Sequence, residues 1–258
     1  MIQLLPVRVF YHVYIPADLK AQLWSSHVDQ QLGMISSSGL KDVATVELLI
    51  TMPMHWTSMF GTPIFANGLS HVVTTFAAKV REYISARYPW ASIVEMRDSS
   101  ENQFEAPTLR RMWQESQKQK FIALYIHTKG SGNPSESVLN WRDILNYYHI
   151  HGWKRAPDLL RHYQVLSVED SHSQQNPIVS GNFFWTTSDY LRTLADPVRS
   201  EIYTTNPDVW PGASLYRYAF ELWILSGNPL VYSWAHTNVN HYFEYCFLED
   251  LLQQYPLE

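Results

Sequence analysis

The stretch Phe121–Trp141, FIALYIHTKGSGNPSESVLNW, decides how this chain of 258 residues folds. It opens with six apolar residues, 121–126, a length and composition typical of a strand that is buried on both faces. A polar turn, His127–Gly130, and a loop of Ser, Gly, Asn and Pro follow, and a helix is predicted to begin within 135–137. Because α/β proteins bind ligands just past the carboxyl ends of their strands, this turn is the first candidate site.

The rest of the chain alternates predicted strands with predicted helices. Hydrophobic periodicity and turn residues predict strands over 7–14, 43–51, 91–96, 165–168, 178–185 and 230–234, and helices over 18–38, 69–84, 105–117, 135–162, 188–194, 215–225 and 241–253. This alternation predicts an α/β fold, with a mainly parallel, twisted sheet and helices on both faces. No repeat or linker divides the chain, so we expect one domain over 1–258, with a long surface loop or lid over 196–214.

Composition narrows the class of protein. The formal net charge of −5 argues against a protein that coats nucleic acid. Aromatic residues make up 14% of the chain and suit a site for sugars or bases, although tyrosines on an ordinary surface would also explain them. The single cysteine, Cys246, excludes an internal disulfide and fits a reducing compartment. With no signal-like leader and no apolar run of membrane-spanning length, we expect a soluble, cytoplasmic protein that could still contact a membrane surface.

The turn after the central strand carries side chains that suit an anionic ligand. In the functional interpretation, His127, Thr128, Lys129 and Gly130 surround a phosphate group, and backbone N–H groups and the lysine bind a diphosphate. Arg142, on the next helix, would add a two-point contact. In the structural interpretation, Thr128 and Gly130 only shape the turn and Lys129 is solvated. The pattern alone favours neither interpretation.

A second polar motif, SGNFFW, spans 180–185. Gly181 would let the backbone come close to a ligand, Asn182 offers an amide that reads hydroxyl groups, and Trp185 offers a flat apolar wall. This mixture suits a sugar. A bulged core strand explains the same residues at least as well.

Glu221 is the leading candidate for proton transfer. It lies four residues after Arg217 on a predicted helix, among large apolar neighbours. A glutamate in such a place is either paired, here with Arg217, or a general base with a raised pKa. The spacing favours the pair.

Polar residues also follow the predicted 91–96 strand, and some of them could bind ribose hydroxyls or a metal: Asp98, Glu101, Asn102 and Glu105. Most such clusters are solvated loops or charges at a helix N-terminus. The histidines do not predict a zinc site. His149 and His151 are two residues apart on a predicted helix and so face different ways, and His236 and His241 have no supporting cluster.

Four short motifs, taken in their order, resemble a family of glycosyltransferases of the GT-A type. They are YIHTKG at 125–130, Trp141-Arg142, SGNFFW at 180–185 and FExW at 220–223. The family occurs in surface-polysaccharide gene sets and in large algal viruses. The His-Thr-Lys turn followed by Trp-Arg is also similar to glycosyltransferases of rhamnan synthesis. The resemblance extends over about residues 7–245.

The resemblance implies one nucleotide-diphosphate-binding domain, with a nucleotide-binding part over about 1–130 and an acceptor part over about 131–258. It implies a hexosyl- or deoxyhexosyltransferase that moves a sugar from a nucleotide-sugar donor to a hydroxyl of a glycan or lipid-linked acceptor, in polysaccharide or glycoprotein glycan synthesis. The alternative is a non-catalytic glycan- or nucleotide-binding protein on the same scaffold. A sugar hydrolase ranks last, because it needs two facing carboxylates and no pair can be nominated.

The resemblance also implies roles for residues. Many GT-A enzymes hold a metal ion on the diphosphate with an Asp-x-Asp motif, and His127-Thr128-Lys129 stands at that position here. Either Lys129 and Arg142 replace the charge of the metal, or Mn²⁺ or Mg²⁺ is held by other groups, with Asp98, Glu101 and His236 as candidates. The donor-binding set is His127, Thr128, Lys129, Gly130, Arg142, Asp98 and Asn102. The sugar and acceptor set is Gly181, Asn182 and Trp185, and the candidate bases are Glu221 first and Asp208 second. The donor sugar, its base and the choice between inversion and retention stay open.

Overall fold

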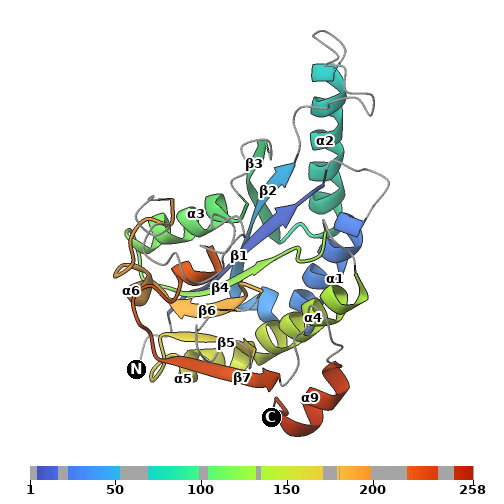
Figure 1. The fold of residues 1–258 in the computed structure, drawn as a ribbon. Helices are drawn as coiled ribbons and strands as arrows, with labels where there is room; N and C mark the ends of the chain where they lie inside the picture. The colour runs from blue at the N-terminus through green and yellow to red at the C-terminus, as the bar shows by residue number, and fades with distance from the viewer. Residues whose placement is uncertain are drawn as a thin grey trace, which may run out of the picture.

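A seven-stranded sheet runs through the described part of the protein (Figure 1). The computed structural model describes residues 5–16, 23–52, 69–98, 104–131, 135–170, 179, 181–198, 220–237 and 247–257. The strands lie side by side in the order β3-β2-β1-β4-β6-β5-β7. Their bounds are β1 Val7–Tyr14, β2 Ala44–Met52, β3 Ala91–Asp98, β4 Ile122–His127, β5 Val165–Asp170, β6 Phe184–Thr187 and β7 Val231–Thr237.

The sheet is mainly parallel, as predicted. β1 pairs in parallel with both β2 and β4, β2 with β3, and β5 with β7. β6 is the exception, since it runs antiparallel to β4 and to β5. Because β6 runs against β4, the residues just before β6 lie at the same edge of the sheet as the residues just after β4. This single reversal brings the candidate site together.

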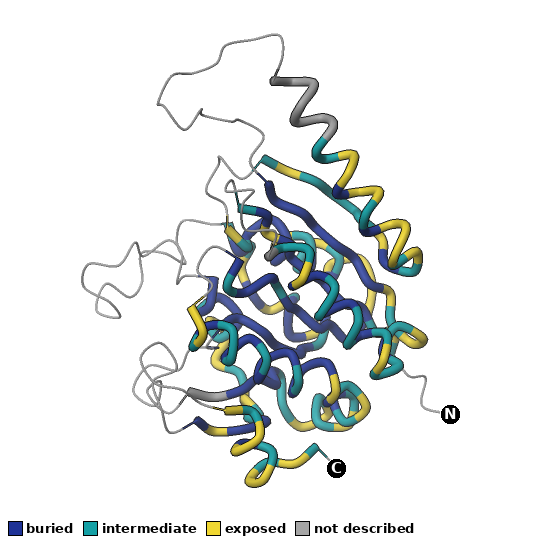
Figure 2. The backbone as a smooth tube through the Cα atoms, turned by 90° about the vertical axis from the view of Figure 1, so that its right-hand side faces the viewer, coloured by how far each residue is buried: buried dark blue, intermediate teal, exposed yellow. Residues whose placement is uncertain are grey.

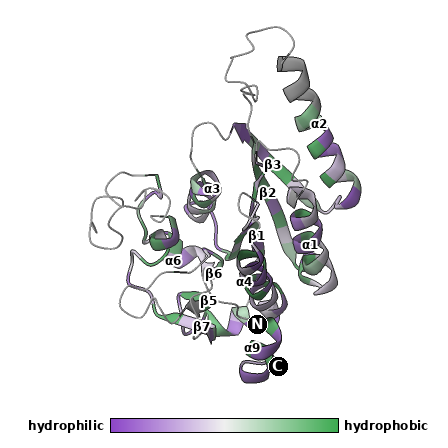
Figure 3. Cartoon of the chain, turned by 45° about the vertical axis from the view of Figure 1, so that its right-hand side comes forward, coloured by the Kyte–Doolittle hydropathy of each residue, from purple (hydrophilic) through white to green (hydrophobic). Residues whose placement is uncertain are grey.

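Helices cover both faces of the sheet (Figures 1 and 3). One face carries α1, α2 and α4, and the other carries α3 and α6. The helix bounds are α1 Leu23–Ser37, α2 Leu69–Arg87, α3 Ala106–Ser116, α4 Glu136–Asn146, α5 Ala156–Leu159, α6 Ser188–Leu191 and α9 Leu248–Gln254, with a short helical turn over Leu40–Asp42. In the described ranges, no helix has both the length and the apolarity that crossing a bilayer requires.

The central strands are buried on both faces, which Figure 2 shows as dark blue tube in the middle of the molecule. Tyr11 and Leu124 point to the α1–α4 side and belong to one hydrophobic cluster. Phe10 and Tyr125, their neighbours in sequence, belong to the cluster under α3 and α6. Alternate residues of one strand therefore fill two cores, which is the reason the 121–126 run is apolar throughout.

The single helix predicted over 135–162 is wrong. α4 ends at Asn146, and the chain continues through a π-helical turn, Tyr147–His151, and a 3₁₀ turn, Gly152–Lys154, before α5 begins. Pro157 lies in the first turn of α5. A proline has no backbone N–H, and a continuous helix would need that group for its hydrogen bond to residue 153. The chain must therefore restart its helix there.

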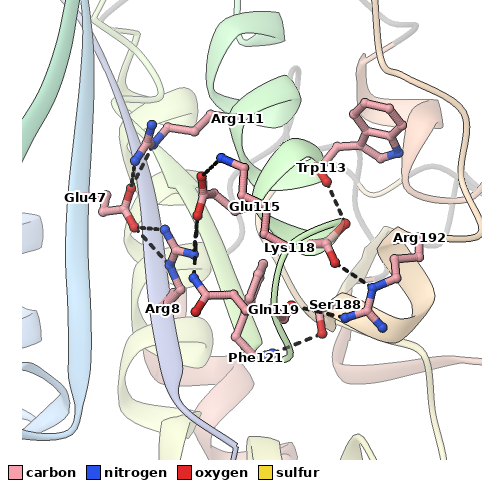
Figure 4. Close-up of polar contacts among 11 residues, drawn as sticks. Arg8, Glu47, Arg111, Trp113, Glu115, Lys118, Gln119, Phe121, Ser188 and Arg192 are labelled. Atoms are coloured by element: carbon pink, nitrogen blue, oxygen red, sulfur yellow. Dashed lines mark hydrogen bonds and ion pairs between the residues drawn. The ribbon is translucent and has the colours of Figure 1, made fainter.

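A buried ion-pair network fixes α3 over the sheet (Figure 4). Arg8 on β1 donates from Nε to Oε1 of Glu47 on β2 at 2.9 Å and from Nη1 to Oε2 of Glu115 on α3 at 2.9 Å. Arg111 donates from Nε to the other oxygen of Glu47 at 2.8 Å, and Lys118 holds Glu115 at 2.8 Å. Arg8 and Glu47 are both buried. Removing one partner from such a network leaves an uncompensated buried charge, so the network specifies where α3 docks.

Candidate functional site

Three segments that the sequence analysis singled out separately meet at the carboxyl edge of the parallel strands. β4 ends at His127, and the turn that follows carries Lys129. α4 brings Arg142 back against that turn, where Nη1 donates to the Lys129 carbonyl oxygen at 3.4 Å. The turn before β6 brings Gly181, whose carbonyl oxygen accepts from His127 Nε2 at 2.8 Å. We take this edge as the candidate site.

Thr128 and Gly130 shape the turn. The Thr128 hydroxyl accepts from the Tyr14 backbone N–H at 2.8 Å and donates to the Tyr14 carbonyl at 3.3 Å, which latches the turn to the end of β1. Gly130 has a φ of 86°, a conformation that side chains rarely adopt. The geometry at these two positions matches the structural interpretation.

Lys129 and Arg142 are two cations that the fold buries together, with 7% and 6% of their surfaces exposed. The Arg142 guanidinium group makes fewer hydrogen bonds to the described residues than it has N–H donors. Its Nε has no hydrogen-bond partner among the described residues, and its Nη2 is 3.8 Å from Oδ1 of Asp143, a side chain that is 43% exposed. Burial lowers the pKa of Arg142, and Asp143 and Tyr11 act in the opposite direction. A buried guanidinium group with free donors can bind an anion.

His27 and Gln31, on α1, complete this side of the edge, and the sequence analysis missed both. His27 is buried with Nδ1 3.2 Å from the Ser131 hydroxyl, and burial, followed by the charge of Arg142, lowers its pKa to about 4. Gln31 donates from Nε2 to the His127 carbonyl at 3.0 Å and accepts from the Tyr11 hydroxyl. Both are polar residues on the inward side of a helix, and that pattern was their signal.

Gly181 lets neighbouring side chains close over the turn before β6. A Cβ at this residue would lie 2.5 Å from Leu145 Cδ1, 2.9 Å from Trp141 Nε1 and 3.3 Å from Lys129 Cε. Gly181 also has a φ of 80°. The close approach that the sequence predicts at this glycine is thus made by side chains of α4 and the 127–130 turn.

Asn182 follows in the same turn and is fully buried, with a φ of 54°. The positive φ values at 181 and 182 explain why β6 begins only at Phe184, later than the strand predicted over 178–185. The Asn182 amide nitrogen donates to Oε2 of Glu105 at 3.0 Å. Oε1 of the same carboxylate lies 3.6 Å from His127 Nδ1. Glu105 therefore belongs to the site. In the sequence it was one of four acidic and amide residues after the 91–96 strand, and nothing there distinguished it from the others.

His12 lies beside this group on β1, in register with His127 on β4. Its Nδ1 is 2.8 Å from the Thr108 hydroxyl on α3, and its Nε2 is 3.3 Å from the Thr51 hydroxyl on β2. Burial lowers the pKa of His12 to about 4; the charge of Glu105 raises it and His127 lowers it further. The imidazole is therefore neutral at pH 7. The signal in the sequence was a histidine at an inward position of a strand.

Trp185 does not form a wall of the site. Its side chain is fully buried, its residue pairs with Leu124, and its indole N–H donates to the His149 carbonyl at 2.8 Å. These contacts place it in the core on the α1–α4 side. The acceptor role predicted for Trp185 is wrong, because β6 alternates its side chains and Trp185 faces inward.

The metal candidates do not form one site. Asp98 ends β3 and His236 lies on β7, and these strands are the opposite edges of the sheet. Six strand spacings of about 4.8 Å separate them by about 29 Å, so they cannot share an ion. Glu101 and Asn102 lie outside the described residues. Within the described ranges, no group of three His, Cys, Asp or Glu side chains could hold a metal. Whether the protein needs a metal stays a prediction untested by the fold.

Glu221 is buried in a short helical stretch, 220–223, between the fully buried Phe220 and Trp223. Phe220 packs with the α3 and α6 side of the core. Its role as a base stays a prediction. Asp208 and Arg217 lie outside the described residues, as does most of the loop predicted over 196–214.

Comparisons with known proteins give three results. The family described as "Domain of unknown function (DUF8361)" matches residues 10–231. No curated protein matches the chain. Among solved structures, a "putative nucleotide-diphospho-sugar transferase" from Desulfovibrio desulfuricans G20 is similar, with a TM-score of 0.43 and 8% identity over 90% of this chain and 81% of that one. A likeness at this level leaves function to be argued from the residues of the chain itself.

Proposed function

Because the chain belongs to the family described as a domain of unknown function (DUF8361), whose description assigns no activity, we propose from its own residues that it is a glycosyltransferase that uses a nucleotide-diphosphate-sugar donor. The observation that carries the proposal is the pair of buried cations, Lys129 and Arg142, at the carboxyl end of the central strand β4. The sequence motifs described above support the same reading.

The charge balance at Arg142 favours an anionic ligand. A buried charge is costly unless an opposite charge and hydrogen bonds compensate it. Asp143, at 3.8 Å and 43% exposed, compensates this charge only in part, and Arg142 Nε has no hydrogen-bond partner among the described residues. A diphosphate has the charge and the oxygen geometry that a guanidinium group binds through two contacts. Its negative charge rises as it leaves the sugar, so the two cations would stabilise the transition state.

The same cations bear on the metal. A divalent ion on the diphosphate of GT-A enzymes supplies positive charge, and Lys129 and Arg142 place positive charge at the corresponding turn. We therefore favour the reading in which these side chains take over that charge. The proposal further includes transfer of a hexosyl or deoxyhexosyl group to a glycan or lipid-linked acceptor in polysaccharide synthesis. The family resemblance supports this part of the proposal.

A non-catalytic nucleotide- or glycan-binding protein is the second candidate. Binding of a nucleotide or glycan needs the cations but no base. Two residues of the predicted sugar and acceptor set, Trp185 and Gly181, make packing contacts within the protein. An assay for transfer of the sugar to an acceptor or to water distinguishes the two functions, because only a glycosyltransferase would transfer the sugar.

The test is donor binding by calorimetry and thermal shift. The protein is titrated with UDP-, GDP- and dTDP-linked sugars, with and without Mn²⁺. We expect one nucleotide class to bind and Arg142→Met to weaken it at least tenfold. Arg161→Met is the matched control, because Arg161 is 55% exposed and lies on the surface. The proposal fails if no donor binds, or if Arg142→Met binds as tightly as the native chain.

A further inference from the structure

Glu105 places a carboxylate against the same turn that Lys129 contacts. Its Oε2 accepts from the Asn182 amide at 3.0 Å, and its Oε1 lies 3.6 Å from His127 Nδ1. Lys129 Cε lies 3.3 Å from the position that a Cβ on Gly181 would take. The side chain of Lys129 and the carboxylate of Glu105 therefore both approach the turn at 181–182. The side chain of Glu105 is 14% exposed, more than Lys129 or Arg142 as whole residues.

The hydrogen bonds fix where the protons are on His127. The Gly181 carbonyl oxygen can only accept, so Nε2 carries a proton and donates to it at 2.8 Å. In the neutral ring, Nδ1 then has a lone pair that faces Oε1 of Glu105. Two acceptors with no proton between them cannot form a hydrogen bond, and their separation of 3.6 Å fits this state. The pair therefore has room for one more proton, shared between Oε1 and Nδ1.

We infer that Glu105 is the base that takes the proton of the acceptor hydroxyl, and that His127 is the residue that positions it. The inference rests on the proposed function and deepens it. In the step, the acceptor O–H bond breaks and its proton moves to Glu105, where His127 Nδ1 shares it. The acceptor oxygen forms a bond to the anomeric carbon. The bond from that carbon to the diphosphate breaks, and its electron pair leaves with the diphosphate toward Lys129 and Arg142.

The other titratable groups near Glu105 and His127 do not compete for the proton of the acceptor. His12 on β1 is neutral at pH 7, since burial lowers its pKa to about 4. Burial, followed by the charge of Glu105, raises the pKa of Tyr125 on β4 well above its ordinary value, so its hydroxyl keeps its proton. Thr108 and Thr51, from α3 and β2, hold His12 through uncharged hydroxyls. The side chain of Lys129 also approaches this turn, with its Cε 3.3 Å from the position that a Cβ on Gly181 would take.

The first experiment needs no substrate. The ring signals of the eleven histidines are followed by NMR as a function of pH, and His127→Gln identifies those of His127. In Glu105→Gln, the carboxylate that favours the protonated ring is gone, so we expect the His127 signals to change at a lower pH than in the native protein. Asp158→Asn is the control, because Asp158 is 76% exposed. An unchanged His127 titration in Glu105→Gln would show that the two groups share no proton and would overturn the inference.

The second experiment measures donor binding and sugar transfer in the same variants. We expect Glu105→Gln to keep donor affinity within about threefold and to lose transfer by about 10²- to 10⁴-fold, the usual range for removal of a general base. Asp158→Asn, whose side chain is 76% exposed, should transfer at close to the native rate, and Glu221→Gln is measured beside it as the rival candidate for the base. Glu105→Asp, with the same charge on a shorter side chain, should recover part of the rate and serves if Glu105→Gln does not fold.

The two proposals fail separately. If donor binds and Glu105→Gln transfers sugar normally, Glu105 is not the base and the proposed function stands. If Glu221→Gln alone abolishes transfer, the base is Glu221. If no nucleotide sugar binds, the proposed function and the catalytic role of Glu105 fall together, and the NMR titration still decides whether Glu105 and His127 form a coupled pair.

Discussion

The Nε2 atom of His127 donates to the carbonyl oxygen of Gly181 at 2.8 Å, across 54 residues of sequence. This bond ties the turn after β4 to the turn before β6. It exists because β6 runs antiparallel to β4 and starts where β4 ends. The cations of one turn and the Asn182–Glu105 contact of the other are thereby held at one edge of the sheet.

Gly181→Ala should destabilise the protein by about 2–4 kcal/mol, because its Cβ would overlap with Leu145 and its backbone has a positive φ. Gly33→Ala is the matched control. Gly33 lies within α1, and apart from its chain neighbours and the backbone of its own helix no atom lies within 4 Å of the position that a Cβ would take, so alanine there should stabilise by about 0.5–1 kcal/mol. Urea unfolding measures both. Equal effects at the two glycines would contradict the packing that we describe around Gly181.

Arg142→Met should weaken donor binding and yet leave the fold as stable as before, or more stable by about 1–2 kcal/mol. Its guanidinium group is buried and poorly compensated, and replacing such a charge by an apolar side chain of similar length often stabilises a protein. Urea unfolding without ligand and calorimetry with donor measure the two effects. A loss of 3 kcal/mol or more in the free energy of unfolding would indicate a structural partner for Arg142 and would weaken the case for an anion site.

Glu115 should contribute stability above pH 4.5 that disappears as the pH falls toward 2. Burial raises the pKa of this carboxyl, but hydrogen bonds from Lys118 and Arg8 outweigh it and lower the pKa from 4.5 to about 2. The folded state therefore binds its proton later than the unfolded state, so protonation favours unfolding over this interval. The difference in unfolding free energy between the native chain and Glu115→Gln should be constant above pH 5 and shrink below it. A difference that is independent of pH between 5 and 2 would contradict the ion pairs in Figure 4.

His12 and His149 should make the protein less stable as the pH falls from 6.5 to 4. Burial lowers the pKa of each to about 4, so the folded state holds them neutral while the unfolded state binds protons from about pH 6.5. The stability that each contributes is present above pH 6.5 and is lost down to about pH 4. His12→Asn should reduce the slope of unfolding free energy against pH in this interval. His162→Asn, at an exposed position, should leave the slope unchanged.

The sequence predicted the central part of the fold well, because the signal there is local. Side chains that alternate between two cores make β1 and β4 apolar on both faces, so each was found to within a residue. The prediction of one helix over 135–162 was wrong. The helix is interrupted at Pro157 and by a π-helical turn, and that turn packs against residues that are distant in the chain. The site followed the same division. The position of Lys129 and Arg142 after the central strand was predicted, and the structure brings them into contact there, whereas Glu105 was named only as one of four polar residues after the 91–96 strand.

By itself, the sequence determined which segments are strands, that the sheet is mainly parallel, and that a cationic turn follows the central strand. Periodicity and turn chemistry are properties of neighbouring residues, so they can be read without the fold. Only the tertiary structure decided that Trp185 faces the core, that Asp98 and His236 lie on opposite edges, and that Glu105 meets His127 and Asn182. Those facts depend on the order of strands and on the reversal of β6, and both are set by packing between segments that are distant in the chain.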